Sequence, residues 1–95
     1  MIVHVIMFKL NDRSPENAQR AKDAFLSMQG NVPQLRHLEV GIDALHSERS
    51  YDLVMTAHFD SWDDLQAYQQ DPFHNALRNS LKSHFAAMVT VDYES

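Results

Sequence analysis

The first ten residues, MIVHVIMFKL, alternate as a β-strand does, yet both sets of alternating positions are mainly apolar. One set is made up of Ile2, His4, Ile6, Phe8 and Leu10, and the other of Val3, Val5, Met7 and Lys9. A strand that is apolar on both sides has to be covered on both sides. We therefore expect a sheet whose two faces are both in contact with other parts of the structure.

A polar stretch over residues 11–14 leads from this strand into a predicted helix. Ser14 followed by Pro15 has the pattern of an N-cap with proline at the first helical position. Apolar residues then recur at helical spacing, and Gly30 predicts the end of the helix. Beyond the connector at residues 31–33, the pattern predicts strands over residues 35–42 and 51–59, with a polar loop at 43–50 between them.

Two further helices are predicted in the second half of the chain. Ser61 and Asp64 approximate a capping box and start a helix with Trp62, Leu65 and Tyr68 on one side. The pair Asp71-Pro72 interrupts it, because a residue before proline avoids the α region. The next helix starts there, and its apolar stripe is predicted to contain Leu77, Leu81, Phe85 and Met88.

The closing segment MVTVDYES alternates as a fourth strand, with Val89, Val91 and Tyr93 on one side. The resulting order, β-α-β-β-α-β, is that of a ferredoxin-like α+β subunit: one domain over residues 1–95, with a four-stranded antiparallel sheet and helices on one face. The other face would expose an apolar surface in a monomer, and such a surface indicates an interaction site. A symmetric homodimer, sheet against sheet, covers it.

The composition of the chain argues against several classes of function. The chain carries 8 Lys and Arg against 13 Asp and Glu, a net charge of −5, and has no basic run. This argues against nucleic-acid binding, which depends on neutralising phosphates. The sequence lacks cysteine, a signal-peptide pattern and an apolar run near the roughly 20 residues of a membrane span. We expect a soluble cytoplasmic protein with no membrane partner.

Four segments, VHVIMFKL, SYDLVMTAHFDSWDDLQAY, DPFH and VDYE, together resemble the stress-responsive dimeric α/β-barrel family over nearly the whole chain. The resemblance implies ferredoxin-like subunits whose two sheets close a barrel across a dimer. A plant branch of the family includes a polyketide cyclase that works without a cofactor and has a Tyr-x-x-His-Pro-x-His segment.

That resemblance places the cyclase's tyrosine and histidine roles on Tyr68 and His74, and an early strand histidine on His4. Two positions depart from the cyclase pattern: Asp71 stands where the histidine before the proline would be, and Leu53 where a histidine of the third strand would be. The main expectation is therefore a homodimer that holds a small, largely apolar or aromatic molecule between sheet and helices. The alternatives are a cofactor-independent cyclase-like enzyme and a structural stress protein with a filled core.

The residues themselves allow acid–base chemistry. With Asp71 as N-cap, His74 falls at the third helical position and on the apolar stripe facing the sheet. Burial and the positive helix end favour a neutral imidazole, which suits a general base. In this hypothesis His74 removes an α-proton while Tyr68 or His4 polarises a carbonyl. The residues expected to surround the ligand are Ile6, Phe8, Phe25, Val40, Leu77 and Leu81.

The less specific interpretation is that these polar groups are hydrogen-bonded core residues. Trp62, Phe25 and Phe85 are expected in the core, where any of them could line a cavity. His37, His46 and His84 are expected in solvent. No two histidines have the i,i+4 spacing of helical zinc ligands, so we expect no metal site and no cofactor. Heme or flavin monooxygenase chemistry, known in related barrel families, has no residue signature in this sequence.

Overall fold

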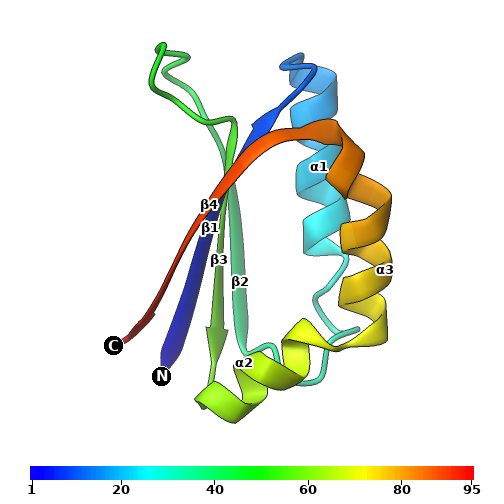
Figure 1. The fold of residues 1–95 in the computed structure, drawn as a ribbon, viewed down its shortest axis with the longest axis vertical. Helices are drawn as coiled ribbons and strands as arrows, with labels where there is room; N and C mark the ends of the chain where they lie inside the picture. The colour runs from blue at the N-terminus through cyan, green and yellow to red at the C-terminus, as the bar shows by residue number, and fades with distance from the viewer.

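The chain forms its elements in the predicted order, and the computed structural model describes all of residues 1–95. They are β1 (Ile2–Leu10), α1 (Pro15–Leu26), β2 (His37–Ile42), β3 (Leu53–Phe59), α2 (Trp62–Gln69), α3 (Pro72–Leu81), a 3₁₀ turn η1 (Lys82–His84) and β4 (Phe85–Glu94). The strands form one antiparallel sheet in the order β2-β3-β1-β4, with the helices on one face (Figure 1). This confirms the ferredoxin-like prediction. None of the helices has both the length and the apolar character needed to cross a membrane.

The three predicted helix starts are capped by the side chains that the sequence indicated. The Ser14 and Ser61 hydroxyls each accept a hydrogen bond from a backbone amide three residues later. The Asp71 carboxylate accepts one from the amide of His74 at 3.0 Å. Each cap satisfies an amide that the helix leaves without an internal partner. Gly30, with φ of 82°, lies in the turn beyond α1, because that helix already ends at Leu26.

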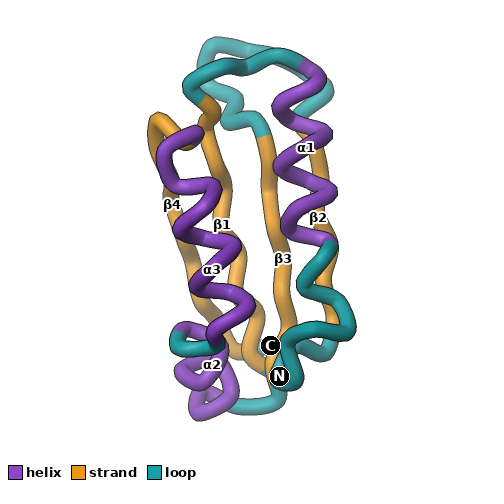
Figure 2. The backbone as a smooth tube through the Cα atoms, turned by 90° about the vertical axis from the view of Figure 1, so that its right-hand side faces the viewer, coloured by secondary structure: helices purple, strands orange, loops and turns teal.

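The core fills the space between the sheet and the helices. Helix α1 lies over the β2–β3 half of the sheet, and α3 over the β1–β4 half (Figure 2). Between them, the Phe8 ring packs on Phe25 and Phe85, with ring centroids 4.7 and 4.6 Å apart. These three rings join α1, β1 and β4 in one core.

Two predictions about large side chains were wrong. Phe85 and Met88 belong to β4 and not to the α3 stripe, because α3 ends at Leu81 and the chain turns through η1. Trp62 is 46% exposed, and its Nε1 donates to Glu94 Oε1 at 3.1 Å. An α-helix needs 3.6 residues for a full turn, so residues spaced three apart drift steadily around the helix. Trp62, six positions before Tyr68, therefore lies about 120° around α2 from it.

The sheet face away from the helices is apolar across β1 and β4. Val5 pairs with Val91 and Met7 with Val89 in the register of these two strands, and the side chains of Met7, Val89, Val91 and Tyr93 are among the exposed large apolar residues. We call these four residues the open-face patch. It is the unpartnered apolar surface that the alternation of the first strand predicted.

Candidate functional site

A cavity of about 230 Å³ lies under α3, between that helix and strands β1 and β4. Its apolar lining comes from Ile6, Phe8, Phe25, Met55, Leu77, Phe85 and Met88. Its polar lining comes from His4, Tyr68, Gln69, His74, Arg78, Lys82, Thr90 and Asp92. An apolar space with a few converging polar groups is the usual composition of a small-molecule site.

His4 enters the cavity from β1, where it stands directly opposite Asp92 of β4. Its side chain is 8% exposed, and Nδ1 is hydrogen-bonded to the Asp92 carboxylate. A carboxylate accepts, so Nδ1 of His4 donates, and the neutral ring then has its lone pair on Nε2. The bond fixes both the orientation and the tautomer of the ring.

His74 enters the cavity from the first turn of α3, where the Asp71 cap sets the start of the helix. Its Nδ1 lies 3.0 Å from the carbonyl oxygen of Tyr68, which can only accept, so Nδ1 carries the proton and Nε2 the lone pair. Burial lowers the pKa of His74 below its usual value, although the hydrogen bond to Tyr68 opposes the change. The ring is therefore neutral at physiological pH.

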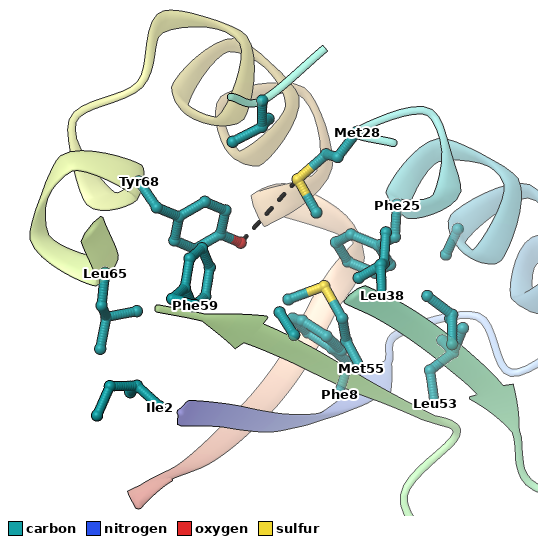
Figure 3. Close-up of a cluster of buried hydrophobic side chains, with 14 of the residues drawn as sticks. Ile2, Phe8, Phe25, Met28, Leu38, Leu53, Met55, Phe59, Leu65 and Tyr68 are labelled. Atoms are coloured by element: carbon teal, nitrogen blue, oxygen red, sulfur yellow. Dashed lines mark hydrogen bonds between the residues drawn. The ribbon is translucent and has the colours of Figure 1, made fainter. Parts of the chain in front are cut away.

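Tyr68 comes from the last turn of α2 and is 1% exposed. Its hydroxyl points at the sulfur of Met28, 4.0 Å away, within the buried apolar cluster (Figure 3). Burial raises the pKa of Tyr68 far above its usual value, so the phenol stays protonated. What Tyr68 presents to the cavity is chiefly its ring.

The Tyr68 ring lies between the two imidazoles. Its centroid is 3.9 Å from that of His74 in a stacked arrangement and 6.1 Å from that of His4 in an edge-on one. The three residues proposed from the sequence are thus brought together at one end of the cavity. Two of them, His4 and His74, present a nitrogen with no protein partner.

The expected ligand-contacting residues divide into two groups. Ile6, Phe8, Phe25 and Leu77 line the cavity. Val40 does not, because it is buried on β2, at the opposite edge of the sheet. Leu81 does not either, because it closes the last turn of α3 and faces a separate crevice with Leu10 and Ala21.

Three charged residues of the cavity were not foreseen from the sequence. Asp92 is one of two acidic residues in the last strand, and its partner depends on the β1–β4 register. Arg78 and Lys82 follow His74 at intervals of four residues. That spacing places them on the same side of the helix and was a usable signal.

The remaining histidines lie outside this cavity. His37, His46 and His84 are exposed, as predicted. His58 of β3 stands opposite His37 of β2, with ring centroids 4.9 Å apart. No group of three or more histidine or acidic side chains is arranged to hold a metal ion.

Comparison with known proteins gives a family and a fold. The sequence matches the stress responsive A/B barrel domain, Dabb, over residues 2–95. It is 32% identical to an uncharacterised protein of Streptomyces coelicolor, with 99% of both chains covered. A dimeric ferredoxin-like protein of unknown function from Thermobifida fusca has a TM-score of 0.86 at 26% identity, over 99% of this chain and 90% of that one. A dimeric ferredoxin-like protein from Bacteroides fragilis has a TM-score of 0.82 at 26% identity, over 99% and 95%.

Proposed function

Because this chain belongs to the stress responsive A/B barrel domain family, we propose that it is a homodimer that binds one small, largely apolar or aromatic molecule per subunit. The cavity under α3 is the proposed binding site. The single observation that carries the proposal is the composition of this cavity: an open apolar space with two oriented imidazoles at one end.

The dimer is proposed to form through the open-face patch. Solved relatives from Thermobifida fusca and Bacteroides fragilis are described as dimeric, and both share the fold of this chain. The four patch residues are between 40% and 59% exposed in the isolated chain. Burying them against the same surface of a second copy removes apolar area from water and closes a barrel of two sheets.

The cavity sets the size of the ligand. Its volume of about 230 Å³ is below the range of roughly 300–1,000 Å³ that is typical of drug-sized ligands. A single aromatic ring with a short substituent is the class of molecule that fits.

Cofactor-independent acid–base catalysis is the second candidate function, and the paired Nδ1 hydrogen bonds favour it. Each bond directs a lone pair to Nε2, so either His4 or His74 can accept a proton from a bound carbon acid. In a cyclase-like aldol step, the carbanion would attack a carbonyl of the same molecule. The proton taken from carbon would then return to the new alkoxide oxygen. Tyr68, whose hydroxyl faces Met28, would position His74 by stacking and not act on the substrate directly.

Binding can be tested with neutral single-ring fragments such as p-toluamide, followed by amide chemical-shift changes and calorimetry. The proposal expects shifts concentrated at residues of β1, β4 and α3 that line the cavity. Thr90→Trp places a large ring at the cavity wall and should abolish them. Asn79→Trp, at an exposed site of α3 outside the cavity, is the size-matched control and should leave them intact. If no single-ring fragment binds, the alternative of a structural protein is favoured.

A further inference from the structure

Two cations line the cavity wall formed by α3 and η1. Arg78 and Lys82 are both exposed and both border the cavity. They are the only Lys or Arg residues after Arg49, in a chain whose net charge is −5. Arg78 lies in the last turn of α3, and Lys82, four residues later, is the C-cap of that helix in helical conformation, so the two follow the same side of the wall.

Neither cation is neutralised by a carboxylate of the protein. The ion pairs of the structure involve other residues, and the only side-chain hydrogen bond of either group runs from Arg78 to the amide oxygen of Asn75, at 2.9 Å. The one acidic side chain of the cavity, Asp92, is held by His4 on the opposite strand. Two like charges on adjacent turns repel each other, so this arrangement has a small cost to the helix.

The charge of Arg78 also acts inside the site. Burial is the main cause of the lowered pKa of His74, and the Arg78 guanidinium lowers it further. An anion bound beside Arg78 would therefore be close to the imidazole as well. The apolar lining would hold a ring, while the two cations would hold a negative group at the wall beside it.

From this arrangement we propose that the ligand is an aromatic or short-chain carboxylate, with the carboxylate paired to Arg78 and Lys82 and the apolar part in contact with Ile6, Phe85 and Met88. This inference rests on the proposed small-molecule function and adds the charge of the ligand to it. A guanidinium recognises a carboxylate through parallel hydrogen bonds, and a lysine adds a second positive charge. Asp92 would repel the carboxylate, and so orients it toward α3.

The test compares p-toluate with p-toluamide, which has the same ring and no charge, by calorimetry and amide shifts at neutral pH. The wild-type chain should bind toluate roughly tenfold more tightly than the amide. Arg78→Gln/Lys82→Gln should lose this preference while still binding the amide. Arg20→Gln/Lys22→Gln on α1, outside the cavity, removes the same charge and should retain it. Added salt should weaken only the binding of toluate.

The outcomes separate this inference from the proposed function. Equal affinity for the two probes, or a preference that survives Arg78→Gln/Lys82→Gln, would overturn the assignment of a carboxylate ligand. The proposed binding site under α3 would still stand. Efficient competition by inorganic phosphate would show general anion binding and would overturn the assignment of a ring-bearing carboxylate. If neither probe binds, both proposals are wrong. Thermal unfolding of each variant checks that the loss of helix C-terminal cations has not unfolded α3.

Discussion

The imidazole of His74 lies nearly parallel to the phenol ring of Tyr68, with centroids 3.9 Å apart, and its Nδ1 donates to the carbonyl oxygen of the same residue. One residue thus fixes the position, plane and tautomer of the other. The contact spans the break between α2 and α3, where Asp71 and Pro72 force the chain to turn. The helix junction is therefore also what assembles the site.

The lowered pKa of His74 predicts that this residue makes stability depend on pH. The unfolded chain binds the proton more tightly, so the free energy of unfolding falls as the pH drops below about 6.5, the usual histidine pKa, toward the folded-state value. His74→Gln should show a shallower loss of stability across this window. Urea unfolding at neutral and mildly acidic pH measures the difference.

An NMR titration provides the control for that experiment, because the chain contains six histidines. The ring resonances of His74 should titrate at a pH below the usual histidine pKa. A His74 resonance that titrates at or above the usual histidine pKa would contradict the neutral ring.

Removal of the Tyr68 hydroxyl should have little effect. A methionine sulfur is a weak acceptor, so Tyr68→Phe should change the free energy of unfolding by less than about 1 kcal/mol. Tyr68→Ala removes a ring that is 1% exposed and should cost about 3–5 kcal/mol. If ligand affinity or turnover falls with Tyr68→Phe while stability is kept, the hydroxyl itself acts on the substrate, and the positioning role is wrong.

The bond between His4 and Asp92 should contribute to stability as well as to orientation. Asp92→Asn replaces a charged acceptor by a neutral one and should reduce the free energy of unfolding by about 1–2 kcal/mol. Glu48→Gln, at an exposed loop position, should change it by no more than about 0.5 kcal/mol. Nitrogen chemical shifts of His4 report the effect on the tautomer of its ring. We expect a mixed tautomer population in Asp92→Asn and the Nδ1–H tautomer alone in the wild type.

The open-face patch predicts the effect of charge on the oligomeric state. Val91 is 59% exposed in the isolated chain, and Val91→Glu should weaken the dimer by about tenfold or more, because it places two carboxylates across a symmetric apolar interface. Thr90→Glu, one residue away but on the helix-covered face, should leave the dimer unchanged. Sedimentation equilibrium measures the oligomeric state of both variants. A wild-type chain that is a stable monomer at micromolar concentration would rule out the dimer.

Periodicity and capping signals were sufficient for the fold. Alternation in the first strand placed His4 on the same face as Ile6 and Phe8, and the Asp71-Pro72 start placed His74 on the inner side of α3. These are local properties, set by the two-residue repeat of a strand and the 3.6-residue repeat of a helix. Local spacing gave a wrong prediction where it fitted two kinds of element. Phe85 fits a helical stripe, but it is the first residue of β4.

The sequence by itself determined the order of the elements, the apolar character of both sheet faces and the inward direction of His4 and His74. Only the tertiary structure decided what those residues meet. The pairing of His4 with Asp92 depends on the register between β1 and β4, which brings together residues 88 positions apart in the chain. The direction of the Tyr68 hydroxyl depends on Met28, which lies between α1 and β2. Whether the space under α3 is open follows from how side chains from both ends of the chain pack together, and no short-range pattern records that.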